Sequence, residues 1–250
     1  HGVGVGNMLA ISKDPLLLNW EKLTGKPVIP FANEDESPLP YGIYDPCIWK
    51  KGDYYYCLNG GTLPHPHSDD HIRANFLFRS KDLKNWDYMH QFVEGDFFTR
   101  VGDDGSCPYF FPIGDQHILL LYSHMSGGQY LLGDYDMERD KFVVTQGAKF
   151  NFGAAGPSGV HAPSATPDGK GGLIVIFNMN PGKPTSGWNQ IMTLPRRLTV
   201  DGDEVSIVPA GDLESLRVNG QHFNDIRLPK NQEVVLESIQ GNAMEFQVEI

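Results

Sequence analysis

The chain has 250 residues, and 40% of them are hydrophobic, which is enough to form a buried core and argues against a disordered protein. Its formal net charge of -11 argues against nucleic acid or an anionic membrane as a partner and suits a neutral ligand. No run of 18 apolar residues occurs, so no membrane-spanning helix is expected. The 28 glycines and 18 prolines follow no collagen-like period, which indicates a turn-rich globular protein.

The three cysteines are Cys47, Cys57 and Cys107. An odd number without metal-ligand spacing argues against a disulfide framework or a zinc site. A turn folds the segments of Cys47 and Cys57 together, so a disulfide between them is the alternative to two buried thiols. The chain begins with His1 and shows no signal-peptide pattern. We therefore expect a start that has been trimmed, and the sequence indicates no cellular location.

The first thirty residues predict the outer strands of a sheet. A glycine-rich apolar strand is expected over Val3–Ile11, and a second apolar segment carries Trp20. Pro27 and Pro30 follow it and block further strand pairing. Residues 31–40 form a polar, acidic loop that also contains prolines.

The stretch from Tyr41 to Gly60 reads as a turn, an inner strand, a tight turn at Gly52 and a second strand. Asp45 precedes Pro46 at the start of the inner strand. Proline fixes its own φ and pushes the preceding residue into extended geometry, so the carboxylate has a defined place. The same arrangement recurs at Cys107-Pro108 and at Ala162-Pro163. The sequence therefore predicts repeated sheet units that share a centre.

The predicted strands come in consecutive groups of four, separated by strong turn signals. The first group is Cys47–Lys50, Tyr54–Leu58, Ala74–Arg79 and Trp86–Gln91, with a long loop from Gly60 to Arg73. The second group is Cys107–Pro112, His117–Ser123, Gln129–Tyr135 and Phe142–Thr145. The third group is Val160–Ala165, Leu173–Asn178, Ile191–Leu194 and Leu198–Val208.

The repeat of these groups favours an all-β propeller. Pro46, Pro108 and Pro163 are 62 and 55 residues apart, close to the ~40–50 residues of a four-stranded blade with room for long loops. A β-sandwich also uses short strands with frequent turns and is the alternative. The propeller is preferred because the groups of four have matching starts.

The pattern changes after Pro209. One helical turn is expected over Asp212–Arg217, followed by strands over Gln232–Ile239 and Ala243–Ile250. The last strand alternates cleanly between apolar and polar residues, so one face requires a partner sheet. We therefore divide the chain into a propeller portion, residues 1–208, and a linker with the first strands of a second β domain, residues 209–250.

Asp45 is the leading candidate for chemistry, because the strand starts of a propeller line a polar funnel. A carboxylate there can stabilise an oxocarbenium-like centre or bind sugar hydroxyls. The alternative is an aspartate that caps its own turn. His65, His67 and His71 lie in the long loop and offer a metal site, although loop histidines with mixed spacing are usually solvated. We expect no metal and no cofactor.

Several short motifs, in their order and spacing, resemble glycoside hydrolase family 32, the invertase and fructanase family. They are Leu18–Lys22 with Pro27–Ile29, Tyr44-Asp45-Pro46, Ser80–Trp86, Ser106-Cys107-Pro108, Ala162-Pro163, Gly187–Leu198 and Leu213–Arg217. The resemblance implies a five-bladed β-propeller, of which blades two to five are visible here, followed by the start of a β-sandwich. It also implies hydrolysis of a furanoside, most simply a β-fructofuranoside, as the activity, with a small-molecule or oligosaccharide substrate.

The departures from the family pattern bear on catalysis. The family's Asn-Asp-Pro-Asn motif, which carries the nucleophile, has no counterpart here. Tyr44 replaces the arginine of the family's Arg-Asp-Pro motif, and Ser106 replaces the acid/base glutamate of its Glu-Cys-Pro motif. Serine is far too weak an acid for this role. The family's double displacement requires two carboxyl groups ~5–5.5 Å apart. This chain keeps Asp45, which the family assigns to substrate binding and transition-state support.

Asp104 and His161 are the candidates to replace the missing acid. Asp103 and Asp104 directly precede the Ser106 motif, and His161 occupies a blade start where the family often has tyrosine. The imidazole pKa suits an acid, while a polar residue that only binds sugar is the alternative for His161. Further candidates for substrate contacts are Tyr44, Asn59, Ser106, Cys107 and Trp188, whereas Trp49 is assigned to the core.

Two classes of function follow. The first is a family-32-like hydrolase whose catalysis is altered or lost through Ser106, and the second is a non-catalytic carbohydrate-binding propeller. A different furanosidase with His161 or Asp104 as acid is a variant of the first. An open remnant of four blades would leave two sheet faces unpacked. The sequence therefore also predicts that a missing N-terminal segment or a second copy completes the propeller.

Overall fold

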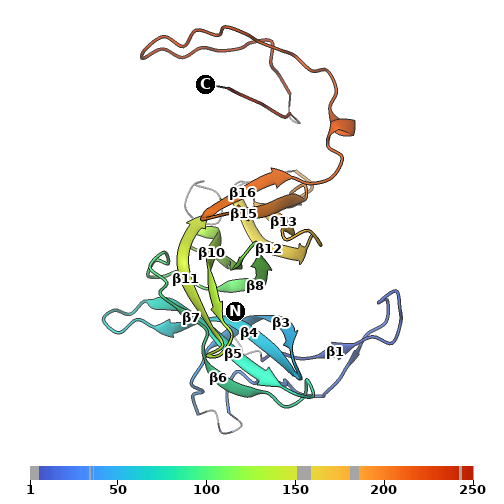
Figure 1. Cartoon of the computed structure of the whole chain (residues 1–250), viewed down its shortest axis with the longest axis vertical. Coiled ribbons are helices and arrows are strands. Elements are labelled where there is room, and N and C mark those ends of the chain that lie inside the picture. The colour runs from blue at the N-terminus through green and yellow to red at the C-terminus, as the bar shows by residue number, and fades with distance from the viewer. Residues whose placement is uncertain are drawn as a thin grey trace. The chain divides into compact units, whose positions relative to one another are not determined.

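The computed structural model describes residues 6–33, 35, 37–150, 159–180, 186–241 and 244–249. The contacts between residues divide the chain into two compact units, residues 1–211 and residues 212–250. Every strand of the described residues belongs to the first unit (Figure 1). The second unit has one short 3-10 helix, η1, over Glu214–Leu216. Across the described part of the chain, no helix has both the length and the apolar character needed to cross a membrane.

The first unit begins with a two-stranded ladder of β1 (Ala10–Ile11) and β2 (Glu21–Lys22). The strand expected over Val3–Ile11 is much shorter, and an isolated bridge joins Asn7 to Ile29. Residues 3–5 of that expected strand lie outside the described residues. The sheet is therefore smaller at this end than the sequence predicted.

The next sheet has four antiparallel strands in the order β3-β4-β5-β6. They are β3 (Ile43–Lys51), β4 (Tyr54–Pro64), β5 (His71–Ser80) and β6 (Asp87–Gln91). All four were expected, but β4 and β5 extend into the segment Gly60–Arg73 that was expected to be a loop. Only residues 65–70 connect them, so His65 and His67 lie in a short hairpin connection, whereas His71, which was expected in the same loop, begins β5.

The second large sheet has the order β7-β11-β10-β9-β8. Its strands are β7 (Val93–Glu94), β8 (Ser106–Ile113), β9 (Gln116–Ser123), β10 (Gly127–Asp136) and β11 (Lys141–Lys149). The predicted four strands are all present. The sequence missed β7, which pairs in parallel with the outer strand β11. This segment, just after the first large sheet, therefore completes the edge of the second.

The third large sheet has the order β12-β13-β15-β16, and β14 also pairs with β13. Its strands are β12 (Gly159–Pro167), β13 (Leu173–Asn180), β14 (Ile191–Met192), β15 (Arg196–Asp201) and β16 (Glu204–Pro209). The single strand expected over Leu198–Val208 was wrong. The chain turns back there through Gly202, whose φ is +58°, so this segment forms a hairpin. Such a φ suits glycine at a two-residue hairpin turn.

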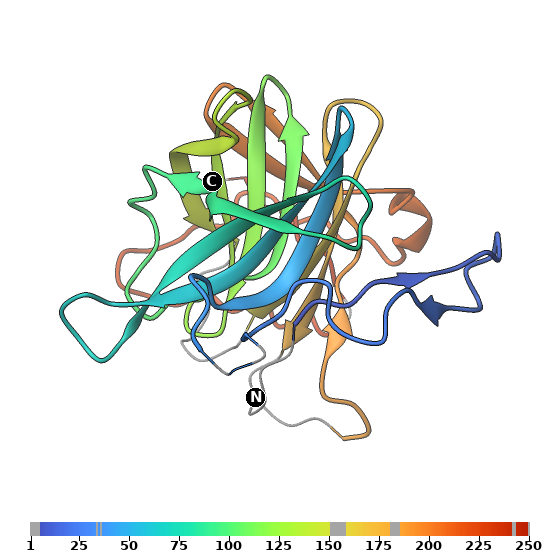
Figure 2. The same ribbon diagram turned by 90° about the horizontal axis from the view of Figure 1, so that it is seen from below.

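The three large sheets adjoin one another through their inner strands. Strand β8 contacts β3 on one side and β12 on the other. In Figure 2 the first large sheet, in blue to teal, and the second, in green, lie next to each other. Consecutive antiparallel sheets whose first strands meet are the arrangement of a β-propeller. Of the four sheets expected in residues 1–208, three are full-sized and the first is the short β1–β2 ladder.

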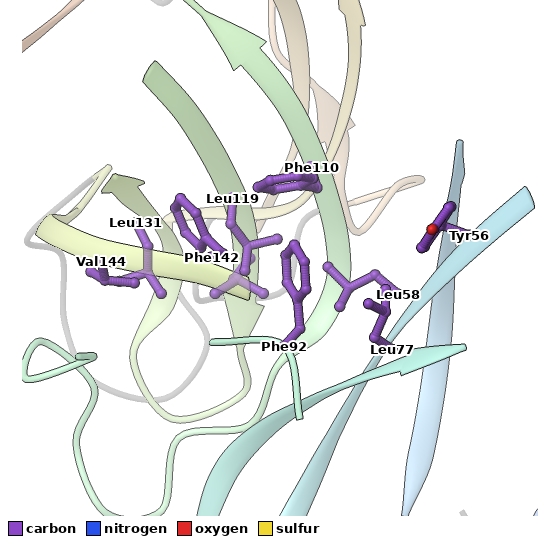
Figure 3. Packing of buried hydrophobic residues seen from close by; sticks show 10 residues of the cluster. Tyr56, Leu58, Leu77, Phe92, Phe110, Leu119, Leu131, Phe142 and Val144 are labelled. Atoms are coloured by element: carbon purple, nitrogen blue, oxygen red, sulfur yellow. The ribbon is translucent and has the colours of Figure 1, made fainter. Parts of the chain in front are cut away.

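Apolar side chains between neighbouring sheets form the core. Figure 3 shows the cluster between the first two large sheets, which includes Phe92, Phe110, Phe142, Leu58 and Leu77. Phe92, Phe142, Leu58 and Leu77 are fully buried, and burial of one such side chain contributes about 1.5–3 kcal/mol. A second cluster of buried residues packs between the second and third large sheets.

The expected roles of Trp49 and of the cysteines can be compared directly with this core. The Trp49 ring lies 5.7 Å from the Tyr56 ring and 5.5 Å from the Phe110 ring, so its assignment to the core is confirmed. Cys47 and Cys57 lie on the paired strands β3 and β4, as expected. All three cysteines are free thiols, so the alternative of a disulfide between Cys47 and Cys57 is not realised.

The second unit contains no strand within residues 212–241 and 244–249. The expected helical turn near Asp212 is present as η1. The expected strands Gln232–Ile239 and Ala243–Ile250 are not formed in the described residues; residues 242, 243 and 250 lie outside them. Phe246 and Val248 are 61% and 73% exposed. An alternating segment needs a partner sheet on its apolar face to become a strand. Assignment of this unit to a β-sandwich stays a prediction.

Candidate functional site

The three proline-marked strand starts share one irregularity. The strand register shifts between Ile43 and Pro46, between Ser106 and Tyr109, and between His161 and Pro163. The residues before the second and third prolines, Cys107 and Ala162, have positive φ values of +50° and +28°. Positive φ is strained for residues with a side chain, and bulges redirect side chains at the edges of sheets. The register shift is therefore common to the three blade starts, but the extended geometry expected before each proline was wrong for Cys107 and Ala162, where the backbone at the bulge takes a positive φ.

Asp45 is exposed at the first of these starts and reaches the second. The backbone N–H of Cys107 donates a hydrogen bond of 2.9 Å to Asp45 Oδ2. The Cys107 thiol lies 3.6 Å from the same oxygen. These contacts join residues 62 positions apart in the sequence. They fix one carboxylate oxygen at the junction of β3 and β8.

Ser106 is buried, and its hydroxyl donates a hydrogen bond of 2.6 Å to Asp104 Oδ2. The backbone N–H of His124 donates to Asp104 Oδ1 at 2.8 Å, and His124 Nδ1 lies 2.9 Å from Asp104 Oδ2. Burial opposes the ionisation of Asp104, but the hydrogen bonds from Ser106 and His124 outweigh it and lower the pKa of this carboxyl. Asp104 is consequently an ionised acceptor at neutral pH.

The Cys107 thiol lies near both carboxylates. Burial, followed by the charge and hydrogen bond of Asp45 and the charge of Asp104, raises the pKa of Cys107 to about 12. The thiol is therefore neutral and acts as a weak donor to Asp45. A reactive cysteine has a lowered pKa, so this site does not present a thiolate nucleophile.

His161 lies at the third blade start and is 7% exposed. Its ring stacks on the Tyr122 ring at 4.8 Å with an interplanar angle of 29°. Tyr122 lies directly opposite Ser106 in the β8–β9 ladder, and its ring is 4.9 Å from the His124 ring. Direct contacts thus connect the three blade starts in one patch. The structure brings Asp45, Ser106 and His161 together.

The remaining candidates for substrate contacts differ in accessibility. Tyr44 is 42% exposed, and its hydroxyl hydrogen-bonds the Thr62 hydroxyl at 3.0 Å. Asn59 is fully buried, and its amide donates to Cys57 Sγ at 3.4 Å, so a ligand does not reach it in this structure. Trp188 is 49% exposed and precedes β14. Because Asn178 of β13 pairs with both Met192 and His161, Trp188 belongs to the same end of the third sheet as His161.

A buried polar network lies behind Asp104, and sequence reasoning found only its Asp103. Asp103 accepts hydrogen bonds from Ser123 Oγ at 2.6 Å and from the Arg100 N–H at 2.8 Å. Burial opposes ionisation of Asp103, but these bonds lower its pKa. The Arg73 guanidinium, whose side chain is 2% exposed, pairs with Asp96 at 2.6 Å and donates to Gln129 at 3.1 Å. A charged or amide residue within a predicted apolar strand was the sequence signal that could have identified Arg73 and Gln129.

His124 was also missed, although it follows the end of β9 directly. A polar residue just beyond a predicted inner strand was the signal that could have identified it. The histidines of the β4–β5 connection show no comparable arrangement. His65 Nδ1 accepts the backbone N–H of His67 at 3.2 Å. In the parts of the chain that the structure describes, no group of three His, Cys, Asp or Glu side chains is placed to hold a metal ion.

Known proteins resemble this chain along most of its length. The family model described as "Glycosyl hydrolases family 32 N-terminal domain" matches residues 6–209. A sucrose-6-phosphate hydrolase of Vibrio alginolyticus is 26% identical over an alignment that covers 87% of this chain and 50% of the relative. A fructan 1-exohydrolase of Bromus pictus is 26% identical, and this alignment covers 87% of this chain and 39% of the relative. The chain thus spans about half the length of such relatives or less.

Solved structures of glycoside hydrolases have the same fold as this chain. A family-32 β-fructofuranosidase of Bombyx mori superposes with a TM-score of 0.65 at 25% identity, covering 86% of this chain and 46% of that one. A thermostable family-43 glycoside hydrolase, at 13% identity, shares the fold with a TM-score of 0.54 and covers 82% and 68%. The predicted propeller class is confirmed. The chain therefore belongs to glycoside hydrolase family 32, and its proline-marked sheets form part of the β-propeller of that family's N-terminal domain.

Proposed function

We propose that the protein is a hydrolase acting on a furanoside, most simply a terminal β-fructofuranoside, and that this chain supplies the wall of the site that carries Asp45. The relatives that support this substrate class are named for the hydrolysis of sucrose 6-phosphate, fructan and β-fructofuranosides. A further structural relative is a β-fructofuranosidase variant in complex with sucrose. An oligosaccharide or disaccharide is accordingly the proposed substrate.

The observation that carries the proposal is the placement of Asp45 among the three blade starts. One oxygen, Oδ2, accepts the Cys107 N–H, while Oδ1 accepts no hydrogen bond from the described residues. A carboxylate fixed through one oxygen can accept hydrogen bonds from sugar hydroxyls through the other. Its negative charge also suits the oxocarbenium-like transition state of glycoside hydrolysis. Asp45 thus fits substrate binding and transition-state support.

The proton donor is the second part of the proposal. The hydroxyl of Ser106 is already donated to Asp104, so Ser106 serves as a sugar contact through its lone pairs. The lowered pKa of Asp104 leaves it ionised, which suits stabilisation of positive charge better than proton donation. His161 then remains as the titratable side chain of the third blade start. It either protonates the leaving group or binds a sugar hydroxyl.

The test is the release of reducing sugar from sucrose, inulin and levan by the natural full-length protein. The proposal expects hydrolysis of at least one of these, with a strong loss in Asp45→Asn. Loss of activity in His161→Ala together with retention in Ser106→Ala assigns the acid role to histidine. Unchanged activity in Asp45→Asn would remove Asp45 from the site and overturn the proposal.

A second function is favoured by the Ser106–Asp104 hydrogen bond. This bond places a satisfied structural pair where the family has its acid/base glutamate. Because Ser106 stands in place of that glutamate, the second proposed function is a propeller that binds the same sugars without hydrolysing them. Calorimetric binding of sucrose or a fructan oligosaccharide that is abolished in Asp45→Asn, with no sugar released over days, would establish the binding function instead.

A further inference from the structure

A carboxylate–histidine pair lies beside the residue that takes the place of the family's acid/base glutamate. His124 Nδ1 lies 2.9 Å from Asp104 Oδ2, and the Ser106 hydroxyl donates to the same oxygen at 2.6 Å. Serine at position 106 does not supply a proton near neutral pH, because its hydroxyl is far too weak an acid. The His124 imidazole is a titratable group that contacts the same carboxylate oxygen as this serine.

Two contacts fix the orientation of the His124 ring. Its backbone N–H donates to Asp104 Oδ1 at 2.8 Å, while its Nδ1 contacts Oδ2, so one carboxylate holds the residue through both oxygens. Burial opposes the ionisation of Asp104, but the hydrogen bonds from Ser106 and His124 lower its pKa, and an ionised carboxylate only accepts. Nδ1 therefore carries a proton, and Nε2 is the nitrogen that gains and loses the second one. A carboxylate sets the tautomer and orientation of catalytic histidines in the same way.

The His124 ring is accessible although its partner is buried. The side chain of His124 is 63% exposed, whereas that of Asp104 is 12% exposed. Because Nδ1 faces Asp104, Nε2 points away from that carboxylate. A general acid has to reach the substrate oxygen and afterwards recover its proton from water, and an exposed ring meets both requirements. His161 is 7% exposed and stacks on Tyr122, which suits a sugar contact better than proton exchange with water.

The strand register places His124 in the patch that contains Asp45. Ser106 pairs with Tyr122 in the β8–β9 ladder, and paired residues of an antiparallel ladder share a face. His124 follows two positions later, which returns to that face, and its ring lies 4.9 Å from the Tyr122 ring. Asp45 accepts the N–H of Cys107, the residue after Ser106. The imidazole and the Asp45 carboxylate therefore belong to neighbouring parts of one site.

We propose that His124, held by Asp104, is the proton donor that replaces the missing glutamate. This assignment rests on the proposed function, because it concerns the same hydrolysis. The Nε2 proton passes to the glycosidic oxygen as the bond between that oxygen and the furanosyl carbon breaks, and the bonding electrons leave with the oxygen. A water molecule adds to the furanosyl carbon and gives one proton to Nε2, which restores the imidazolium. Asp104 stays ionised throughout and is a positioning residue.

The test compares two leaving groups in the natural full-length protein. Sucrose releases a sugar hydroxyl, which needs a proton as it leaves, whereas para-nitrophenyl β-D-fructofuranoside releases a nitrophenolate, which does not. His124→Asn is the principal variant, because the asparagine amide replaces Nδ1 as a donor to Asp104 but has no counterpart of Nε2. We expect it to lower kcat on sucrose by about 10²-fold and kcat on the nitrophenyl substrate by less than about tenfold.

His90→Asn is the matched control. His90 Nδ1 donates to the carbonyl oxygen of Gln91 at 2.9 Å in strand β6, so the same exchange keeps a similar hydrogen bond there. This variant should leave both rates unchanged. His124→Ala is a second variant, in which added imidazole should restore part of the hydrolysis of sucrose, since the side chain that it replaces is 63% exposed. Imidazole should not change the rate of His90→Ala.

The outcomes separate this assignment from the proposed function. Hydrolysis that depends on Asp45 but is unchanged in His124→Asn overturns the role of His124 and leaves the proposed function standing. An equal fall of kcat on both substrates also overturns it, because His124 would then only maintain the site. A difference between leaving groups that appears in His161→Asn instead assigns the proton to His161. If the natural protein hydrolyses neither substrate, the proposed function and the role of His124 fail together.

Discussion

The two ends of β3 join the first large sheet to the second in different ways. At the Lys51 end, the ammonium pairs with Asp140 and donates to Tyr135 OH at 3.2 Å. Tyr135 OH donates to Asp140 at 2.5 Å, and Tyr56 OH donates to it at 3.2 Å. At the Asp45 end, one carboxylate oxygen is held by the Cys107 N–H, and the adjoining backbone has a positive φ at Cys107.

The difference shows how one strand can serve stability at one end and function at the other. The Lys51 end resembles a closed network in which each charged group has several partners. Burial and the nearby Asp140 raise the pKa of Tyr135, so its hydroxyl stays protonated and remains a donor. The Asp45 end has a strained backbone at Cys107, and only one of the two carboxylate oxygens of Asp45 accepts a hydrogen bond from the described residues. Strain and unsatisfied polar groups concentrate at functional sites, while satisfied networks maintain the fold.

The largest expected effect is that of Asp45→Asn on function. The amide oxygen can still accept the Cys107 N–H, so the fold should be kept, but the negative charge is lost. Removal of one stabilising group for transition-state charge typically lowers the rate by about 10²–10³-fold. The measurement is kcat/KM of the full-length protein on sucrose and inulin. Asp53→Asn, in the exposed turn after β3, is the control and should retain activity. An equal loss of kcat/KM in both variants would contradict the assignment of function to the Asp45 end of β3.

Asp140→Asn should have the largest effect on stability. It leaves Lys51, whose side chain is 24% exposed, without its charged partner. Breaking one partner of a buried pair costs about 3–5 kcal/mol, so about 2–3 kcal/mol is expected for this partly exposed pair. Urea unfolding measures the free energy of unfolding. Activity per folded molecule should stay unchanged.

Two further variants test whether the Asp140 effect comes from the pair. Glu138→Gln, an exposed change in the same turn, should alter the free energy of unfolding by less than about 0.5 kcal/mol. Lys51→Met added to Asp140→Asn should restore part of the lost stability, because the unpaired charge is then removed. No recovery in this double variant would show that the tyrosine hydroxyls, not the charges, hold this end together.

Ser106→Ala should have a smaller effect that depends on pH. The pKa of Asp104 is lower in the folded chain than its ordinary value of 3.8, so its hydrogen bonds stabilise the fold fully above that value. This contribution is lost as the pH falls through the lower folded pKa. We expect Ser106→Ala to cost about 1–2 kcal/mol near pH 7 and less below pH 3.8.

Denaturant unfolding at pH 7 and at pH 3 measures this difference. Ser206→Ala, at an exposed position of β16, is the matched control and should show no change between the two pH values. If Ser106→Ala lowers the free energy of unfolding equally at both pH values, the hydrogen bond from Ser106 does not depend on the ionisation of Asp104. The contrast between the two ends of β3 would then rest on Asp45 alone.

The smallest expected effect is that of Ala162→Gly at the third blade start. Glycine relieves the strain of a φ of +28°, but it also gives the unfolded chain more freedom. The net result should be a stabilisation of up to about 1 kcal/mol. Ala165→Gly, in the regular part of β12, should instead destabilise by about 0.5–1 kcal/mol. Thermal unfolding compares the two, and equal losses would argue against strain at Ala162.

Particular residues show how far sequence reasoning reached into the site. Asp45, Ser106 and His161 were identified because each stands at or next to a proline-marked strand start, which is a local signal. Asp104 was included through its position before Ser106. Arg73 and His124 were missed, because their contacts depend on which strand lies beside which. Asn59 was expected to reach substrate, but the pleat of β4 places it inside the sheet.

By itself, the sequence determined the large sheets, their turns and the three strand starts, since alternation, glycine and proline act within a few residues. The tertiary structure decided which side chains meet. The hydrogen bond between Asp45 and Cys107 joins residues that are 62 positions apart in the sequence. The hydrogen bonds from Ser123 to Asp103 and from His124 to Asp104 each join residues that are 20 positions apart. It also decided that the alternating residues near the C-terminus form no strand in the described residues. The physical reason is that a pleated face or a buried carboxylate acquires its state from the neighbours that cover it, and those neighbours come from distant parts of the chain.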